Sequence, residues 1–197
     1  MTMPVRASEL AEVLDGSAWF RRVLDVVAEV DPPEWWVGAG VIRDIVWDSR
    51  FGNGFDHSAV KDVDVALFDP ADVRPERDDQ VDQALAQFES DVPWEAKNQA
   101  AVHLWYPVRF GIEVAPFSSA AEAIATFPET ATAVAVRLER TGSIEVLAPH
   151  GLDDLLDGVW RWNPTRVTVA EYQRRLAKKD PANRWPAVRV LPADGEP

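Results

Sequence analysis

Two apolar runs early in the chain break on residues that a buried core rarely holds. The first, WWVGAGVIRD, contains Gly38-Ala39-Gly40, and the second, KDVDVALFD, contains Asp62 and Asp64. Because alternate residues of a strand point to the same side, the two aspartates project together, while Val63 and Val65 face the core. Two neighbouring carboxylates repel each other unless a cation lies between them. The pattern therefore predicts a strand with one face in the core and two charges on the other.

The rest of the chain predicts alternating helices and strands. Apolar residues at helical spacing predict helices over residues 8–14, 17–30, 41–48, 75–90, 98–105, 120–127, 152–156 and 169–179. Short apolar runs predict strands over 34–37, 62–68, 92–96, 131–138 and 143–147, with the last two joined as a hairpin at Thr141-Gly142. Ser17 and Asn98 are expected helix caps, and 50–61 and 106–119 are expected to be irregular. The predicted class is α/β (α+β): a mixed sheet flanked by helices, with a helix near the C-terminus.

Length and composition indicate one domain. The chain has 197 residues, of which 47% are hydrophobic, enough for a sizeable core. We expect a single domain over residues 1–191, with its core at about 34–156, helical extensions on both sides and a flexible tail at 192–197. The absence of cysteine excludes disulfides and thiolate metal sites. Without an apolar run of roughly 20 residues or a signal-peptide pattern, we expect a cytoplasmic protein with no membrane partner.

The net charge of −13 bears on the choice of partners. A negatively charged surface repels the nucleic-acid backbone, so nucleic acid is disfavoured as a partner. The charge describes the average surface only, and a local basic pocket can still hold a nucleotide phosphate. The nine tryptophans are a high number for this length. We interpret them as core and interface anchors rather than as platforms for base stacking.

The Gly38-Ala39-Gly40 turn lies between a predicted strand and a predicted helix. Small residues there let backbone N–H groups approach a phosphate, and the helix N-terminus adds a favourable dipole. A tight turn with positive φ, or close packing, would explain the same glycines. Magnesium commonly takes one or two carboxylates together with substrate phosphates, which suits Asp62 and Asp64. Taken alone, Asp62 and Asp64 could simply be exposed aspartates at the start of a strand. The glycine turn before them favours a metal site for phosphoryl or nucleotidyl transfer instead.

Several motifs, taken in order, resemble a known family. VGAGVIRD followed by KDVDVALFD resembles the polymerase-beta-like nucleotidyltransferase superfamily, and the turn leading to Arg43-Asp44 is similar to the head of the tRNA CCA-adding enzymes. Together with WEAKNQAAVH, FPETATAVAVRL and LAPHGLDDLL, these motifs resemble a bacterial nucleotidyltransferase-like family of about this size, largely of unknown substrate. The resemblance spans roughly Trp35 to Leu156 and implies a nucleotidyltransferase-like fold. It does not specify a reaction.

The resemblance implies roles for the turn and the aspartates. Gly38, Ala39 and Gly40 would hold the triphosphate of an NTP. Asp62 and Asp64 would be catalytic ligands of two magnesium ions, one bound to the triphosphate and one lowering the pKa of the attacking hydroxyl. An NMP group would pass to an unknown acceptor, a small molecule or a protein, and pyrophosphate would leave. The superfamily usually has Gly-Ser or Gly-Gly at this turn, so with Ala39 the phosphate contacts would come from the backbone alone.

A third acidic ligand completes the superfamily pattern. Glu95 in PWEAKNQ, on a predicted strand, is the expected third catalytic and metal-binding carboxylate. Glu113 in FGIEVAPF is the rival, since Ile112 and Val114 would face the core around it. Glu95 is preferred because its block matches the narrower family. Its alternative role is a surface ion pair with Lys97.

Four further residues are expected to bind the nucleotide. Arg43 would reach a phosphate or pair with a neighbouring aspartate, and Lys61 would contact a leaving phosphate or neutralise the aspartates beside it. Lys97 and Asn98 would contact the base and ribose, with a helix cap as the alternative for Asn98. The basic residues of the last helix are expected to be solvated: Arg174, Arg175, Lys178 and Lys179.

Three functional hypotheses follow. The first is a magnesium-dependent nucleotidyltransferase. The second is a catalytically inactive relative that holds a nucleotide or a partner protein. The third is a metal-dependent phosphohydrolase built on the Asp62–Asp64 pair, for which the chain lacks a histidine–aspartate cluster. Which NTP is used, which acceptor receives the NMP group and the oligomeric state are left open by the sequence.

Overall fold

The computed structural model describes residues 5–193. The helices are α1 (Val5–Asp15), α2 (Ala18–Val30), α3 (Gly40–Phe51), α4 (Glu76–Ala86), α5 (Val102–Phe110), α6 (Ala120–Ile124), α7 (Asp153–Leu156), α8 (Val169–Lys179) and α9 (Pro181–Arg184), with 3₁₀ turns at His57–Ala59 and Gln99–Ala101. The strands are β1 (Trp36–Gly38), β2 (Val63–Leu67), β3 (Trp94–Asn98), β4 (Ala135–Leu138), β5 (Ile144–Leu147), β6 (Val159–Trp160) and β7 (Arg189–Val190). The helix predicted over 169–179 has the predicted bounds, and Ser17 caps α2 by accepting from the N–H of Phe20.

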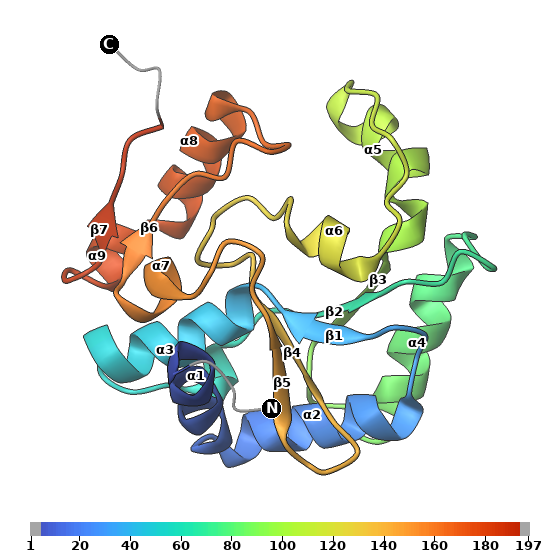
Figure 1. The fold of residues 1–197 in the computed structure, drawn as a ribbon, viewed down its shortest axis with the longest axis horizontal. Helices are drawn as coiled ribbons and strands as arrows, with labels where there is room; N and C mark the ends of the chain where they lie inside the picture. Colours follow the sequence, from blue (N-terminus) through green and yellow to red (C-terminus); the bar gives the residue numbers. More distant parts are fainter. Residues whose placement is uncertain (1–4, 194–197) are drawn as a thin grey trace.

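Within the described residues, a mixed sheet of five strands runs in the order β3-β2-β1-β4-β5 (Figure 1). β2 and β3 are parallel, whereas β1 pairs antiparallel with both β2 and β4. β4 and β5 form the predicted hairpin. A second, smaller sheet joins β6 to β7 in parallel. The mixed sheet flanked by helices confirms the predicted fold class.

The two faces of the main sheet are covered by different helices. On one face, Val37, Val63 and Val65 are fully buried among apolar side chains that include those of α1 to α4. On the other face, Trp36 and Ala66 pack against α6. Figure 1 shows α2 below the sheet and α6 above it. The prediction that Val63 and Val65 face the core is therefore confirmed. Asp64, which lies between them, points to the second face.

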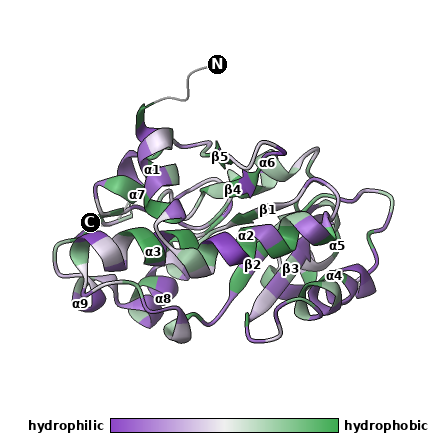
Figure 2. Ribbon diagram, turned by 90° about the horizontal axis from the view of Figure 1, so that it is seen from below, coloured by the Kyte–Doolittle hydropathy of each residue, from purple (hydrophilic) through white to green (hydrophobic). Residues whose placement is uncertain are grey.

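β3 is an edge strand, and α4 protects its free side. The N–H of Ala96 donates to Asp82 Oδ1 at 2.7 Å, and the N–H of Asn98 donates to Asp78 Oδ1 at 2.7 Å. Two carboxylates about one helical turn apart thus satisfy alternate N–H groups of the strand. Figure 2 shows α4 as a largely hydrophilic helix. Its acidic residues therefore fix the sheet edge in addition to solvating the helix.

The C-terminal segment packs against α3 through tryptophans. The ring of Trp47 lies 6.0 Å from that of Trp160 and 5.0 Å from that of Trp185, measured between centroids. Trp47 Nε1 donates to the carbonyl oxygen of Leu155 at 2.6 Å, and Trp185 Nε1 donates to Asp48 Oδ1 at 2.7 Å. All three rings are buried. The core interpretation of the tryptophans is therefore right for these three.

Some elements differ from the predictions. α5 continues through Pro107 to Phe110, where an irregular segment is predicted. A proline inside a helix normally disfavours it because it removes an N–H donor, so the expectation of an irregular segment from residue 106 is wrong as far as Phe110. β3 lies two residues further along than predicted. α9, β6 and β7 are not predicted, because elements of two to four residues carry too little periodicity.

The predicted C-terminal tail is described only in part. Residues 194–197 of the expected tail lie outside the described residues, whereas Ala193 is buried in the main core. Among the helices of residues 5–193, none combines the length and the apolar character needed to cross a bilayer.

Candidate functional site

The expected carboxylates meet where three strands lie side by side. Gly38 on β1 pairs with Asp64 on β2, and Asp64 pairs with Glu95 on the parallel strand β3. Because paired residues point to the same face, Asp64 and Glu95 project together away from the main core. Asp62 lies two residues before Asp64 and close enough for the two charges to interact. The structure thus brings Asp62, Asp64 and Glu95 to one place.

This cluster carries uncompensated negative charge. The pKa of Asp64 is raised from 3.8 to about 7. Burial is the main cause, and the negative charges of Asp62 and Glu95 add to it. Lys179 and Arg175 of α8 act in the opposite direction without cancelling the shift. A cation bound at Asp64 would remove the repulsion and return the carboxyl to its ionised form.

The glycine turn has one tightly packed residue and one strained residue. A Cβ at Gly38 would lie 2.9 Å from the carbonyl oxygen of Val134 and 2.9 Å from the Cβ of Ala135, so β4 leaves no room for a side chain. The positive φ falls on Ala39 (φ 59°, ψ −125°) and not on either glycine. Close packing therefore explains Gly38. The left-handed φ, which glycine adopts without strain, is therefore found at the alanine between the two glycines.

Asp62 and Arg43 border the start of α3. A Cβ added at Gly40 would lie 3.9 Å from Asp62 Oδ1 and 3.8 Å from Arg43 Nη2. The first N–H groups of a helix have no partner within the helix and favour an anion. The end of α3 that would receive a phosphate is therefore adjacent to the aspartates.

Arg43 is buried in an aromatic cage. Its Nε donates to Asp44 Oδ1 at 2.9 Å, and its Nη2 donates to the same oxygen. The Cζ of Arg43 lies 5.2 Å from the ring of Trp160 and 5.3 Å from that of Trp185, within the range of cation–π attraction. Of the two expected roles, the structure shows the pairing with a neighbouring aspartate. The guanidinium still lies beside the turn, at Gly40.

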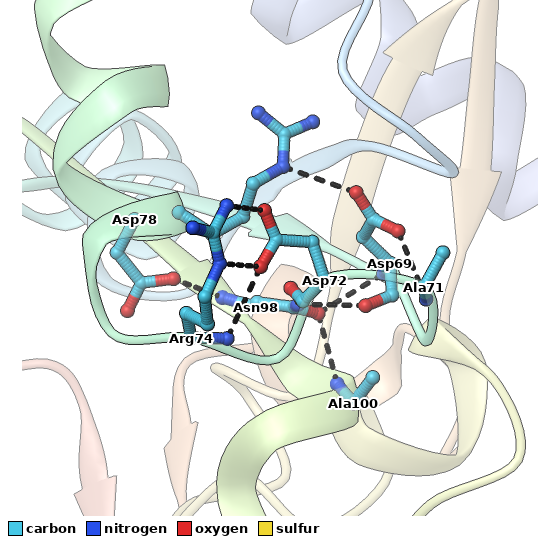
Figure 3. A network of polar contacts seen from close by, with 8 residues as sticks. Asp69, Ala71, Asp72, Arg74, Asp78, Asn98 and Ala100 are labelled. Carbon is cyan, nitrogen blue, oxygen red and sulfur yellow. Dashed lines mark hydrogen bonds and ion pairs between the residues drawn. The ribbon is translucent and has the colours of Figure 1, made fainter.

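Asn98 holds the loop between β2 and α4 (Figure 3). Its Oδ1 accepts from the N–H groups of Asp69 and Ala100 at 3.0 and 3.1 Å. Its Nδ2 donates to the carbonyl oxygens of Asp69 and Asp72 at 2.9 and 2.8 Å. These bonds use the full capacity of a side-chain amide, and Asn98 is only 2% exposed. The structure therefore shows the helix-cap alternative for Asn98.

The remaining expected residues are placed as follows. Lys97 lines the cleft described below, with its Nζ 3.4 Å from Asp78 Oδ2 rather than paired with Glu95. Lys61 is exposed beside Asp62. Glu113 is exposed in the segment 111–117, all of it described, which forms no strand. Without a strand, the side chains around Glu113 do not alternate between core and solvent as predicted. Glu95, in contrast, pairs in register with Asp64.

A cleft of about 1430 Å³ opens beside the carboxylates. Asp64 and Glu95 line it from the sheet, α5 contributes one wall, and α8 with the segment before it contributes another. Figure 1 shows α5 and α8 on opposite sides above the sheet, with α6 between them. The cations that line the cleft are Arg74, Lys97, Arg109, Arg166, Arg174 and Arg175. A chain with a net charge of −13 thus gathers positive charge beside its carboxylates.

A buried ion pair anchors α8. Glu129 is 0% exposed, and its two carboxylate oxygens accept from Arg175 Nε and Nη2 at 2.7 and 3.0 Å. Thr132 Oγ1 donates to Glu129 Oε2 at 3.0 Å. Burial acts to lower the pKa of Arg175, but Glu129, and then Asp64 and Asp62, raise it above its ordinary value. Arg175 therefore stands between a structural anchor and the carboxylate cluster.

Sequence reasoning missed this role of α8. The prediction that its basic residues are solvated is wrong for Arg175, because a buried carboxylate from another part of the chain holds it. Two sequence signals point to the role. Arg175 and Lys179 are four residues apart and so share one side of the helix. Glu129 stands alone among small and apolar residues in FPETATAVAV.

The carboxylates fit a metal ion that is also held by substrate. Among residues 5–193, no group of three or more His, Cys, Asp or Glu side chains is arranged to hold a metal ion. Magnesium does not need such a group, because one or two carboxylates and the phosphates of a substrate suffice. Asp62 and Asp64 meet this requirement, with Glu95 beside them. The raised pKa of Asp64 is consistent with a site suited to a positive charge.

Comparison with known proteins identifies a family and a fold. The family model described as Nucleotidyltransferase matches residues 25–190. An NMR structure described as a CCA-adding enzyme head domain has a TM-score of 0.77 and 26% identity, covering 94% of this chain and 96% of that chain. No curated protein matches the sequence.

Larger solved structures share the fold. A CCA-adding enzyme in complex with CTP has a TM-score of 0.56 and 16% identity, covering 96% of this chain and 44% of that chain. The Thermotoga maritima CCA-adding enzyme complexed with tRNA has a TM-score of 0.53 and 15% identity, covering 93% and 42%. This chain thus spans less than half of each of these two enzymes.

Proposed function

We propose that this chain, which belongs to the nucleotidyltransferase family, transfers an NMP group from an NTP to a hydroxyl of a small molecule or a protein, with magnesium at Asp62 and Asp64. As a member of that family it is a transferase of phosphorus-containing groups. The observation that carries the proposal is the row Gly38–Asp64–Glu95 across three strands, which brings the turn at residues 38–40 beside the carboxylate cluster. Fold likeness alone would not carry it.

The metal would be held by Asp62 and Asp64, with Glu95 as the third carboxylate. The charges of Asp62 and Glu95 disfavour ionisation of Asp64 in the protein alone, and burial of Asp64 adds to that effect. When bound, magnesium would neutralise the triphosphate and lower the pKa of the attacking hydroxyl. The proposal therefore explains why this face of the sheet carries neighbouring carboxylates that raise the pKa of Asp64.

The remaining contacts would come from the chain itself. Backbone N–H groups at the start of α3 would hold phosphate oxygens, and Gly40 leaves space beside them. Arg175 and Lys179 would hold the triphosphate from α8, since both already act electrostatically on Asp64. Glu129 would keep Arg175 in place. Arg43 would support the turn from its cage and not serve as a mobile phosphate ligand.

The reaction is a substitution at the α-phosphorus. The acceptor oxygen forms a bond to that phosphorus while the bond to the bridging oxygen of the β-phosphate breaks. Pyrophosphate leaves with the electron pair of the broken bond, and the acceptor hydroxyl loses its proton to solvent. The protein contributes orientation and charge stabilisation, which are the main requirements of phosphoryl-type transfer.

The net charge of the chain bears on which class of acceptor is proposed. The Thermotoga maritima relative was solved with tRNA, which concerns that protein, and this chain spans less than half of it. With a net charge of −13, most of the surface repels a large polyanion. A small molecule or a protein side chain is therefore proposed in preference to RNA.

Titration calorimetry with α,β-methylene-ATP and the corresponding GTP analogue, with and without magnesium, tests the nucleotide seat. We expect binding of at least one analogue that requires magnesium and is lost in Asp62→Asn/Asp64→Asn. Arg175→Gln is expected to weaken binding while retaining the magnesium requirement. Asp79→Asn, at an exposed aspartate of α4, is the matched control and is expected to bind as the wild type does. Absence of binding by folded protein, or equal binding by the double variant, would overturn the proposal.

A further inference from the structure

The α5 helix leaves an unusual number of apolar side chains in solvent. Val108 is 89% exposed and Leu104 is 52% exposed, and three further residues are more than a third exposed. We call this group the α5 wall: Leu104, Trp105, Val108, Phe110 and Ile112. Every one of them lines the same cleft as Asp64 and Glu95. Exposed apolar side chains gathered in this way mark ligand-binding grooves or interaction surfaces.

The two sides of the cleft differ in chemistry. The α8 side supplies Arg174 and Arg175 to the cleft lining, whereas α5 supplies Arg109. Of these cations, Arg175 acts electrostatically on the Asp64 carboxylate. The α5 wall offers apolar and aromatic surface instead, with the rings of Trp105 and Phe110 centred 6.5 Å apart. A triphosphate is strongly solvated and gains nothing from apolar contacts. It therefore belongs on the α8 side, which leaves the α5 wall for a different ligand.

The size of the cleft agrees with two ligands. Single small-molecule sites are commonly about 300–1,000 Å³, whereas this cleft measures about 1430 Å³. Group transfer requires both substrates to be present at once, with the attacking oxygen beside the α-phosphorus. The carboxylates are linked to both walls, because β3, which carries Glu95, continues through the 3₁₀ turn into α5, and Arg175 of α8 acts electrostatically on Asp64.

We infer that the α5 wall is the acceptor subsite, and that the acceptor is a hydroxyl compound with an aromatic or alkyl body. This inference rests on the proposed nucleotidyl transfer and adds the chemical class of the second substrate. The rings of Trp105 and Phe110, whose planes are tilted by 52°, offer aromatic surface to a ring of the acceptor. Leu104 and Val108 add apolar surface about one helical turn apart, and the acceptor hydroxyl would lie toward Asp64 and Glu95, which line the same cleft.

Two matched probes test the inference by saturation-transfer NMR titration in the presence of magnesium and α,β-methylene-ATP. N-acetyl-L-tyrosinamide carries an aromatic hydroxyl, and N-acetyl-L-serinamide carries a hydroxyl without the ring. We expect the tyrosine probe to bind at least tenfold more tightly. In Leu104→Ser/Val108→Ser this preference is expected to fall below threefold, while the affinity for α,β-methylene-ATP stays within twofold of wild type and shows that the variant is folded. Phe88→Ser is the control, because Phe88 is 49% exposed but lies after α4 and outside the cleft lining.

The outcomes separate the inference from the proposed function. If the analogue binds but the two probes bind equally, or the double variant keeps the preference, the acceptor subsite is overturned and the nucleotide seat stands. If sedimentation shows that wild-type chains associate and that the double variant does not, the α5 wall is an interface between copies, and the inference is again overturned. If the analogue itself does not bind to folded wild-type protein, the proposed function fails, and the acceptor role fails with it.

Discussion

Asp64 and Glu95 stand opposite each other on the parallel strands β2 and β3, on the face of the sheet that borders the cleft. Parallel pairing places their side chains on one face, and Asp62 adds a third charge nearby. A folded chain keeps such a group only at a cost in stability, because burial and like charges both disfavour ionisation. The arrangement is therefore better explained by a bound cation and its substrate than by the stability of the fold.

The cost can be measured as a function of pH. The pKa of Asp64 is about 7 in the folded protein and 3.8 as its ordinary value. Between these pH values the folded state binds more protons than the unfolded state, so the free energy of unfolding falls as pH rises from about 4 to 7. Asp64→Asn removes this penalty. We expect the variant to be more stable than wild type by about 1–3 kcal/mol at pH 8, with the difference vanishing near pH 4.

Urea unfolding in the presence of EDTA, at several pH values, measures this difference. Asp79→Asn serves as the control at an exposed position and is expected to show no such pH dependence. A destabilised Asp64→Asn at pH 8 would show that Asp64 is stabilised by a partner within the fold, contrary to the account.

Glu129 and Arg175 give a prediction for the anchor of α8. Glu129→Gln leaves the partly buried charge of Arg175 without its partner, so we expect a loss of about 3 kcal/mol in unfolding free energy. Glu145→Gln is the control, because the Arg137–Glu145 pair is as short, at 2.6 Å, but rests on a single hydrogen bond and is more than a third exposed. The control should cost less than about 1 kcal/mol. Equal losses in thermal or urea unfolding would contradict a special role for the buried pair.

At Ala39 we expect a substitution to increase stability rather than reduce it. Its φ of 59° lies where side chains are strained, and such residues cost of order 1–3 kcal/mol. Ala39→Gly is expected to raise the free energy of unfolding by about 1 kcal/mol after the entropy cost of glycine is subtracted. Ala11→Gly, within α1, is expected to lower it by about 1 kcal/mol. A destabilised Ala39→Gly would mean that the alanine methyl makes contacts worth more than the strain.

Asn98 separates a structural role from a nucleotide contact. Asn98→Ala leaves two N–H groups and two carbonyl oxygens of a buried network without their partner, so we expect a loss of about 2–4 kcal/mol in stability. Asn53→Ala, in the exposed loop after α3, should change stability by less than about 0.5 kcal/mol. Calorimetry with the ATP analogue provides the second readout. Weakened nucleotide binding at unchanged stability would show that Asn98 contacts the nucleotide directly.

Local patterns in the sequence predict the parts of the site that depend on a few neighbouring residues. Strand alternation puts Asp62 and Asp64 on one side and Val63 and Val65 in the core, as the structure shows for the valines. The turn before α3 is also predicted, because glycine spacing is a local signal. That Ala39 rather than a glycine carries the positive φ is not predicted, and neither is the packing of Gly38 against Val134 and Ala135, which are distant in the sequence.

Long-range contacts explain what the sequence leaves open. Choosing between Glu95 and Glu113 requires the register of β3 on β2, which no local pattern contains. The bounds of α8 are predicted, but its packing depends on Glu129, 46 residues before Arg175. The same applies to Asn98, whose partners Asp69 and Asp72 lie in the loop between β2 and α4, 29 and 26 residues before it. Tertiary contacts, not helix or strand periodicity, therefore determine which polar residues face the cleft.

The most direct test of nucleotidyl transfer is ³¹P NMR of the products formed from the four NTPs, with magnesium and a protein-free metabolite extract as the source of acceptors. The account predicts pyrophosphate together with an NMP-bearing product, and the loss of both in Asp64→Asn. Release of inorganic phosphate with an NDP, lost in the same variant, would contradict it, because the chemistry would then occur at the γ-phosphorus. Pyrophosphate formed equally by wild type and Asp64→Asn would also contradict the account, because the carboxylate cluster would then have no part in the reaction.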